Sequence, residues 1–427
     1  MARKMKDSGI EWIGEIPEGW RTINPKALFT QRKDKAQKGE RQLTSSQQYG
    51  ILYQDDYMEL TGSKVVTVEK DFDILKHVEA GDFVISMRSF QGGLEYSTKS
   101  GAISSAYIML VPNLELVYPR FYKWLLKSSV YIDALQRTTN MVRDGQAMRY
   151  SNFAQVRLFT LPLDEQKSRA DFLDLECSSI DKILSKTRSS IEEYKKLKQA
   201  VITQAVTKGV RGEREMKDSG VGWIGAIPKD WEIKRLKSFC TIVDCKNRTP
   251  DVFPDGKYTV VRTTCIKDCS FSYEGSYQTD TTNFKAWTLK GQPHKGDIFF
   301  TREAPVGEAC LVPNADNLCM GQRVMFFRPE DNSDSRYIMY SIYGPLVREY
   351  IASKNSGSTV GHLKLGQVAC IPIFYCPPLE QKEIADYLDA KCAEIDGLIA
   401  KKEQLVKELE SYKKSLIYEV VTGKREV

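Results

Sequence analysis

The chain has 427 residues, of which 41% are hydrophobic and 28% charged, and this composition is typical of folded proteins and excludes bulk disorder. Lysine and arginine outnumber aspartate and glutamate by 62 to 56, so the net charge of +6 permits nucleic-acid binding without requiring it. No stretch reaches the roughly 20 apolar residues that span a bilayer, and the polar start lacks a signal peptide, so we expect a soluble, cytoplasmic protein.

The first recognisable segment, MKDSGIEWIGEIPEGW at residues 5–20, returns later in the chain. It recurs at residues 216–231 as MKDSGVGWIGAIPKDW, with 11 of 16 positions identical at an offset of 211 residues. A second pair, LPLDEQKSRADFLDLECSSID at 161–181 and CPPLEQKEIADYLDAKCAEID at 376–396, matches at an offset of 215. An internal repeat dictates architecture. The chain is therefore predicted to be a tandem duplication whose ends are well kept and whose middles have drifted.

The middle of the first half, residues 20–160, is predicted to be mixed α/β. Short apolar runs bounded by Gly, Pro and Asp are typical of strands and occupy residues 64–68, 83–87 and 107–111. Residues 120–135 follow as a predicted helix.

A long helix is predicted over residues 166–207. Apolar residues recur there at alternating spacings of three and four, which is the pattern of a coiled coil with a narrow seam. At 1.5 Å per residue such a helix is about 60 Å long. Its predicted seam includes Leu173, Ile180, Leu184 and Ile191.

A polar joint, KGVRGE at residues 208–213, leads into the second half, which repeats the order. Strands are predicted at residues 258–262, 297–301 and 324–328, a helix at 336–351, and a second long helix near the end. The seam of that helix includes Leu388, Ile395, Ile399 and Val406. Polar residues interrupt the two seams at matching places, Thr187 and Lys402, then Lys198 and Lys413. Matching interruptions indicate that the helices pack on each other; the alternative is two unrelated amphipathic helices, each lying on its own domain.

Enzyme signatures are absent from the sequence. It contains no phosphate-binding P-loop, no dinucleotide-binding glycine motif and no nucleophile elbow. The three histidines, His77, His294 and His362, are interpreted as ordinary surface or core residues. We therefore expect no catalytic residue and no bound metal.

Two alternatives depend on local patterns in the second half. Asp251, Asp255 and Lys257 resemble a compressed metal-nuclease pattern, although two acids in a Pro/Gly-rich loop more often cap turns. Four thiols, at Cys240, Cys245, Cys265 and Cys269, could in principle bind zinc, although buried free cysteine is common in a chain without a secretion signal.

Basic and amide side chains gather instead on the predicted loops of both halves. Arginine fits the O6 and N7 acceptors of guanine and glutamine fits adenine, whereas lysine attracts phosphate without sequence information. The candidate DNA-binding residues are Lys33, Lys35, Arg41, Arg88, Gln91, Arg143, Gln146 and Arg149 in the first half, and Lys246, Arg248, Arg302, Gln322, Arg323, Lys354, His362 and Lys364 in the second.

The repeated DSG-x-x-WIG-x-IP leader and the EQK-containing helix start resemble the DNA-specificity subunit of type I restriction–modification systems. The resemblance implies two target-recognition domains that each read half of a bipartite DNA site. It also implies two antiparallel helices that space them and dock adenine-methyltransferase subunits and a restriction (translocase) subunit. S-adenosylmethionine, ATP and Mg²⁺ would then be bound by the partner subunits, and no cofactor by this chain.

The predicted fold class is α/β (α+β), with two globular domains of mixed sheets and a pseudo-two-fold repeat. We place the first recognition domain at residues 1–161, the central spacer helix at 162–211, the second recognition domain at 212–376 and the C-terminal spacer helix at 377–427. Antiparallel helices would bring the chain ends close together. A coiled-coil adaptor whose globular ends bind proteins is the remaining alternative.

Overall fold

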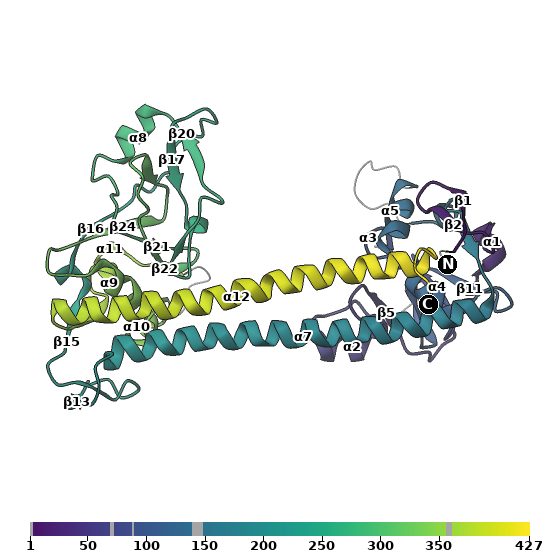
Figure 1. Ribbon diagram of the computed structural model, residues 1–427, viewed down its shortest axis with the longest axis horizontal. Helices are drawn as coiled ribbons and strands as arrows, with labels where there is room; N and C mark the ends of the chain where they lie inside the picture. Colours follow the sequence, from purple (N-terminus) through teal and green to yellow (C-terminus); the bar gives the residue numbers. More distant parts are fainter. Residues whose placement is uncertain (1–2, 69–71, 88, 139–147, 356–360) are drawn as a thin grey trace. The chain divides into compact units, whose positions relative to one another are not determined.

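The computed structural model describes residues 3–68, 72–87, 89–138, 148–355 and 361–427. The chain divides into two compact units: unit 1 comprises residues 1–188 and 404–427, and unit 2 comprises residues 189–403 (Figure 1). Both boundaries fall inside long helices, so each long helix contributes one part to each unit. Within the described ranges, no helix is both long and apolar enough to cross a membrane.

Each unit contains a four-stranded antiparallel sheet with the same strand order. The order in unit 1 is β4 (Phe29–Arg32), β11 (Ile108–Pro112), β8 (Phe83–Ile85) and β9 (Glu95–Tyr96). In unit 2 it is β16 (Cys240–Val243), β24 (Val324–Pro329), β21 (Ile298–Arg302) and β22 (Val306–Leu311). Strands β8 and β21 are buried along their whole length, so both sheets lie in the cores of their units.

Two smaller pairings also occur in both units. The repeated leader forms a hairpin, β1 (Met5–Ile10) with β2 (Gly14–Pro17) and β13 (Met216–Asp218) with β14 (Ala226–Pro228). The next strand pairs with the segment just before the long helix, β3 (Arg21–Ile23) with β12 (Leu158–Thr160) and β15 (Glu232–Arg235) with β25 (Pro372–Tyr375). The predicted α/β duplication is confirmed.

Between these shared elements the two units differ. Unit 1 contains the hairpin β5 (Leu43–Ser46) and β6 (Gly50–Tyr53) and the pair β7 (Lys76–Val78) and β10 (Gly101–Ile103). Unit 2 contains a mixed sheet of β20 (Tyr277–Thr279), β17 (Tyr258–Val261) and β23 (Leu318–Met320), with a hairpin of β18 (Ile266–Lys267) and β19 (Ser270–Phe271). The shorter helices are α1 (Pro25–Leu28), α2 (Gln54–Thr61), η1 (Phe72–Ile74), α3 (Ser89–Gly92), α4 (Pro119–Leu125), α5 (Ser129–Arg137), α6 (Tyr150–Gln155), η2 (Leu236–Ser238), η3 (Thr263–Cys265), α8 (Thr281–Trp287), α9 (Ser335–Ile342), α10 (Pro345–Asn355) and α11 (Leu365–Ala369).

Three local predictions were wrong. Residues 64–68 form no strand, because the side-chain amide of Gln42 takes the place of a strand partner and binds both the N–H and the carbonyl of Val68. The helix predicted at 120–135 is divided into α4 and α5, since Ser128 caps a new helix. The helix predicted at 336–351 is likewise divided into α9 and α10, because Pro345 cannot continue α9 and suits a first helical turn.

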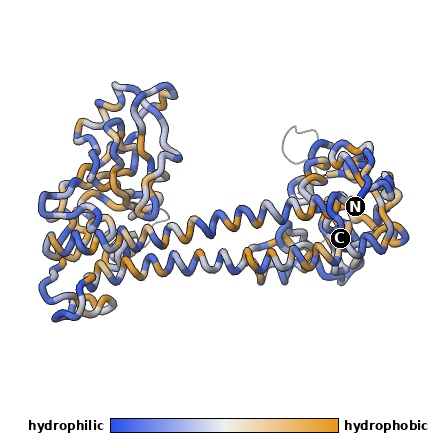
Figure 2. The backbone as a smooth tube through the Cα atoms, in the orientation of Figure 1, coloured by the Kyte–Doolittle hydropathy of each residue, from blue (hydrophilic) through white to orange (hydrophobic). Residues whose placement is uncertain are grey.

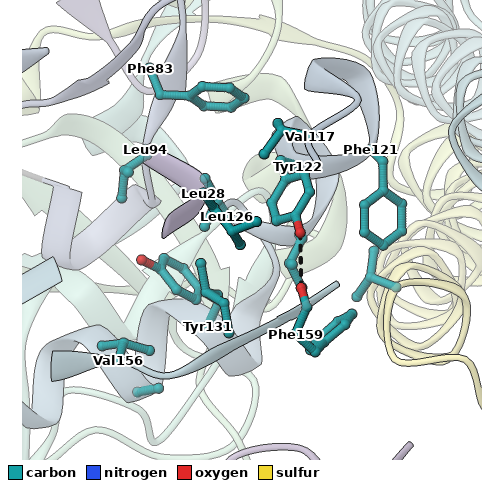
Figure 3. Close-up of a cluster of buried hydrophobic side chains, with 14 of the residues drawn as sticks. Leu28, Phe83, Leu94, Val117, Phe121, Tyr122, Leu126, Tyr131, Val156 and Phe159 are labelled. Carbon is teal, nitrogen blue, oxygen red and sulfur yellow. Dashed lines mark hydrogen bonds between the residues drawn. The ribbon is translucent and has the colours of Figure 1, made fainter. Parts of the chain in front are cut away.

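The core of unit 1 combines aliphatic side chains with several large aromatic ones (Figure 3). Tyr122 is fully buried, and its hydroxyl donates to the carbonyl of Phe159 at 2.8 Å. Unit 2 repeats this bond between the equivalent residues, with Tyr337 donating to the carbonyl of Phe374 at 2.7 Å. Burying a large apolar side chain stabilises by about 1.5–3 kcal/mol, so these clusters hold each unit together.

The two long helices are α7 (Leu163–Lys208) and α12 (Pro378–Val421). The glutamine of the repeated EQK motif anchors each helix start: Gln166 Nε2 donates to the carbonyl of Leu161 and Gln381 Nε2 to that of Cys376, both at 2.8 Å. Hydrophobic and hydrophilic residues alternate along both helices (Figure 2). This alternation is the pattern from which the seam was predicted.

In each unit the apolar seams of α7 and α12 share a core cluster. In unit 1, Leu173, Ile180 and Leu184 of α7 are buried in one cluster with Leu416 and Val420 of α12. In unit 2, the end of α7 lies in one cluster with Leu388 and Cys392. Of the other predicted seam residues, Ile191 and Ile395 are buried, while Ile399 and Val406 are half-buried.

Ion pairs across the seam show that the helices run antiparallel in unit 1, and an equivalent ion pair joins them in unit 2. In unit 1, Asp181 pairs with Lys413 at 2.6 Å, and Arg188, further along α7, pairs with the earlier Glu410. In unit 2, Lys198 pairs with Asp396 at 2.7 Å. Lys198 and Lys413 occupy equivalent positions and so do Asp181 and Asp396, so the second matching interruption of the seams is one ion pair formed twice.

Both long helices are followed by a glycine in the left-handed backbone region, Gly209 at φ 74° and Gly423 at φ 77°. A Cβ on Gly423 would lie 2.5 Å from Pro17 Cγ, so the helix end fits directly against the leader. Arg169, which is 1% exposed, donates to the carbonyls of Val420 and Arg425 at 2.8 and 2.9 Å. Segments near both chain ends therefore meet in unit 1, as predicted.

Candidate nucleic-acid interface

In unit 1 the basic segment predicted to bind DNA is the loop that follows β4. Lys33 and Lys35 are exposed there, and neither pairs with an acid among the described residues. The loop is attached to the body of the unit by backbone bonds, from Ala36 N–H to the Leu75 carbonyl at 3.1 Å and from His77 N–H to the Asp34 carbonyl at 3.0 Å. The two lysines are thus presented to solvent on an anchored loop.

The third predicted cation of this loop, Arg41, has internal partners. Its guanidinium lies 3.6 Å from the centre of the Tyr53 ring and pairs with Asp55 at 2.6 Å and Asp56 at 3.2 Å. The hydrogen bond to Asp55 raises the pKa of Arg41. Arg41 is therefore still exposed, but its charge is largely compensated.

The side chain of His77 also contacts this loop. Its Nδ1 lies 3.0 Å from Glu40 and its Nε2 lies 3.0 Å from Glu79. Burial lowers the pKa of His77, but the hydrogen bonds to Glu79 and Glu40 outweigh burial and the pKa is raised. Through Glu40 and Glu79, the His77 ring thus connects the loop to the turn that follows β7.

The recurring Gly-Asp dipeptide is structural in both units. Asp82 is buried and accepts hydrogen bonds from Arg32, the nearer at 2.6 Å, and these raise the pKa of Arg32. Asp297 is the equivalent residue and pairs with Arg328, also at 2.6 Å. The arginine comes from different strands in the two units, which is why no matching arginine was visible in the repeat.

The other predicted residues of unit 1 are only partly described. Gln91 is exposed on α3, and Arg149 is exposed immediately before α6. Arg88, Arg143 and Gln146 lie outside the described residues.

In unit 2 the equivalent loop follows β16 and is anchored on α8. The indole N–H of Trp287 donates to the carbonyl of Arg248 at 3.2 Å, and the ammonium of Lys246 lies 4.8 Å from the centre of the Trp287 ring. Asn247 and Arg248 are exposed between these anchors. Trp287 therefore sets the position of the loop, and the polar side chains project from it.

Arg302 does not have the role predicted for it. The residue is only 8% exposed, and its guanidinium donates to Asp244 at 3.1 Å and to Asn247 Oδ1 at 2.6 Å. Its strand is buried, so the side chain points into the base of the loop rather than to solvent. The structure corrects the prediction: Arg302 holds the loop in place and is not an exposed reader of bases.

The remaining predicted residues of unit 2 lie near the same loop or on neighbouring helices. Gln322 is exposed, and its Oε1 accepts from the Thr249 hydroxyl at 3.4 Å. Arg323 and His362 both pair with Glu303, at 3.3 and 3.4 Å. Lys354 lies 5.4 Å from the Tyr350 ring, and Lys364 is exposed at the start of α11.

The two alternative sites receive no support from the geometry. No group of three or more His, Cys, Asp or Glu side chains able to hold a metal occurs among the described residues. Burial raises the pKa of Cys240 to about 12 and also raises those of the other three candidate thiols, which disfavours the thiolate that zinc requires. Asp251, Asp255 and Lys257 are exposed on a loop.

Sequence reasoning missed the residues that position the loops. Asp244, Trp287 and Tyr53 carry no motif, and each acts on a residue distant in the chain. One signal in the sequence pointed to these loops. The leader offset of 211 residues aligns the segment after β4 with the segment after β16, which marks them as equivalent loops.

Comparisons with known proteins show which chains this one is similar to. Residues 228–408 match the family model described as type I restriction modification DNA specificity domain. A protein of Methanocaldococcus jannaschii that bears the name MjaX type I restriction enzyme specificity subunit is 23% identical over 433 residues, covering 96% of this chain and 95% of that protein. The MjaVIII specificity subunit of the same organism is 23% identical over 360 residues, covering 81% of this chain and 80% of that protein.

A solved structure concerning complex assembly and conformational transition of the type I R-M system contains a chain with the same fold. It superposes with a TM-score of 0.68 at 14% identity, covering 96% of this chain and 99% of that chain. The resemblance predicted from the leader and helix-start motifs is confirmed.

Proposed function

We propose that this chain recognises a bipartite double-stranded DNA site on behalf of partner subunits. The proposal is based on its similarity to the specificity subunits of type I restriction–modification systems. Unit 1 would read one half of the site and unit 2 the other. The observation that supports this most is one shared framework that carries two different sets of exposed basic loops. A common sheet with unlike loops is what two readers of unlike sequences require.

The partners we propose are adenine-methyltransferase subunits and a restriction (translocase) subunit, as in the family. Modification of a base in a duplex requires that the base be flipped out of the stack. The chain would contribute recognition and positioning, whereas S-adenosylmethionine, ATP and Mg²⁺ would act on the partner subunits. Such a complex would work in the cytoplasm.

The paired helices α7 and α12 would act as the spacer between the half-sites. Half-sites read from one face of a duplex lie about 34–36 Å apart, one helical turn. The length of the helix pair would then set the unread gap. Inserting one heptad into both helices should change the gap length of the methylated motif and leave both half-sites unchanged.

The test of the proposal is an exchange of residues 20–160 for the corresponding segment of another specificity subunit. Sequencing of methylated DNA from a host that carries the partner subunits should show one half of the motif changed and the other kept. A motif that is unchanged would contradict the assignment of unit 1 and would favour a protein-binding adaptor.

Two further measurements address the rival functions. Purified chain incubated with plasmid and Mg²⁺ should neither cleave nor methylate it; cleavage would instead support the nuclease reading of Asp251, Asp255 and Lys257. The affinity of the chain for non-specific duplex should fall steeply as salt rises, because phosphate contacts release counterions. An affinity that is independent of salt would contradict DNA as the ligand.

A further inference from the structure

The loop after β16 in unit 2 presents hydrogen-bond donors and conceals its acceptors. The amide of Asn247 has one acceptor, Oδ1, and one donor group, Nδ2. Arg302 Nη2 lies 2.6 Å from Oδ1, and since a guanidinium only donates, the acceptor end of the amide is occupied. Nδ2 has no partner within the described part of the chain and belongs to an exposed residue.

The next side chain extends this pattern. Arg248 is exposed, and its guanidinium forms no ion pair or hydrogen bond with the described residues. Its backbone is fixed, because the Arg248 carbonyl accepts from Trp287 Nε1 at 3.2 Å. Two adjacent donor groups are therefore directed outward from an anchored backbone, and Arg302 and Trp287 hold them in place.

Base edges differ in what they offer to such a donor pair. In the major groove guanine carries two acceptors, N7 and O6, and no donor. Adenine carries one acceptor beside an amino donor, cytosine an amino donor, and thymine the single acceptor O4, so only guanine offers an acceptor to each of the two donor groups. An amino group facing Asn247 Nδ2 or the Arg248 guanidinium would leave donors unpaired, and an unpaired buried donor is costly.

We propose that Asn247 and Arg248 of unit 2 read a guanine within its half-site through N7 and O6, with Arg302 as the positioning residue that keeps the Asn247 acceptor turned inward. This inference deepens the proposed function and rests on it. It goes further by naming the base class and the residues that read it.

The first experiment selects the preferred sites of purified full-length chain from a library of random duplexes and sequences the bound fraction. We expect a bipartite motif with at least one guanine in the half-site that changes in Arg248→Ala. Replacing that guanine by 7-deazaguanine, which lacks the N7 acceptor, should weaken binding of the unaltered chain by about 5- to 150-fold, the range of a good base contact. The same replacement should have little effect on Arg248→Ala.

A matched control comes from the same unit. Arg235 is also exposed, on β15 and outside the loop, and has no ion pair among the described residues. Arg235→Ala should keep the unaltered motif and the full sensitivity to 7-deazaguanine. Sensitivity lost equally in both variants would show a general charge effect and overturn the inference.

A second variant replaces the outward hydrogen-bond donor of residue 247 by an acceptor. Asn247→Asp keeps an oxygen for Arg302 but turns an acceptor outward in place of the donor. It should discriminate against guanine and favour cytosine or adenine at the same position, a change that loss of structure would not produce. Arg302→Lys, which cannot hold both Asp244 and Asn247, should reduce guanine discrimination while non-specific binding and its salt dependence stay unchanged.

These outcomes distinguish a failure of guanine recognition from a failure of the proposed function. A bipartite motif whose unit 2 half-site is insensitive to 7-deazaguanine and to Asn247→Asp would overturn the guanine reader and leave the proposed function standing. Selection of no motif at all would contradict the proposed function itself.

Discussion

The repeated leader places a tryptophan at the same position in both units, but the two indole groups differ in their partners. Trp20 and Trp231 are both fully buried. Trp20 Nε1 donates to Glu165 at 3.1 Å, whereas Trp231 Nε1 has no hydrogen-bond partner among the described residues. Substitution by phenylalanine therefore removes a similar apolar surface at both positions. It removes a hydrogen bond at Trp20 and an unpaired buried donor at Trp231.

The two variants should differ in how far the free energy of unfolding of their unit falls. This difference comes from the polar interaction alone, since the loss of buried surface is similar in both. Burial raises the pKa of Glu165, but hydrogen bonds from Arg3, Arg169 and Trp20 lower it to about 2, so the acceptor is a carboxylate at neutral pH. A hydrogen bond to a charged group contributes about 1.5–3 kcal/mol, and an unsatisfied buried donor costs about 1–3 kcal/mol. Trp20→Phe should therefore destabilise unit 1 by at least about 1.5 kcal/mol more than Trp231→Phe destabilises unit 2.

Hydrogen exchange measured by mass spectrometry is the suitable assay, because it reports the free energy of opening for peptides of each unit separately. A single global unfolding curve would mix two units and would not be two-state. Trp223→Phe is the control, since Trp223 is 53% exposed and its substitution should change protection little. Equal losses at Trp20 and Trp231, or a larger loss at Trp231, would refute the reasoning.

Three other predictions follow from the same contacts. Tyr122→Phe and Tyr337→Phe should each destabilise their own unit by about 0.5–1.5 kcal/mol, because each removes a buried hydrogen bond; hydrogen exchange should show the loss confined to that unit, and a loss spread over both would contradict it. The raised pKa of His77 means that its contribution to stability is complete below the pKa of the unfolded chain and is lost as pH rises through the folded pKa. Exchange protection around residues 34–40 should therefore fall in the unaltered chain as the pH rises above the ordinary histidine value of about 6.5, and should stay constant in His77→Gln; the absence of this difference would exclude this role for the ring. Leu184→Asp, at a seam residue that is 5% exposed, should destabilise unit 1 by about 2–5 kcal/mol, whereas Ile183→Asp beside it, at 47% exposure, should cost little. Hydrogen exchange of unit 1 peptides in the two variants tests this, and similar losses of protection would count against the seam.

Several features of the fold could be predicted from local patterns because they repeat at fixed spacings. The heptad period located α7 and α12, the offset of 211 residues located the two leader hairpins, and the Gly-Asp dipeptide located β8 and β21. Even the polar interruptions of the seam, Lys198 and Lys413, indicated contact between the helices, although their acidic partners were not predicted. Periodicity is visible in one dimension because it expresses which face of an element is buried.

The candidate site was harder to predict, because exposure is a property of the folded surface. Arg302 and Arg248 are the same residue type, yet Arg302 is enclosed at the end of β21 and Arg248 is exposed on the loop after β16. The difference arises from Asp244, which lies 58 residues from Arg302 in the chain and reaches it only across the sheet. Similarly, Asn247 is a candidate donor only because Arg302 occupies its acceptor oxygen in the folded chain. The sequence by itself determined the duplication, the long helices and the resemblance to specificity subunits; tertiary packing alone decided which loop side chains brace the units and which are exposed.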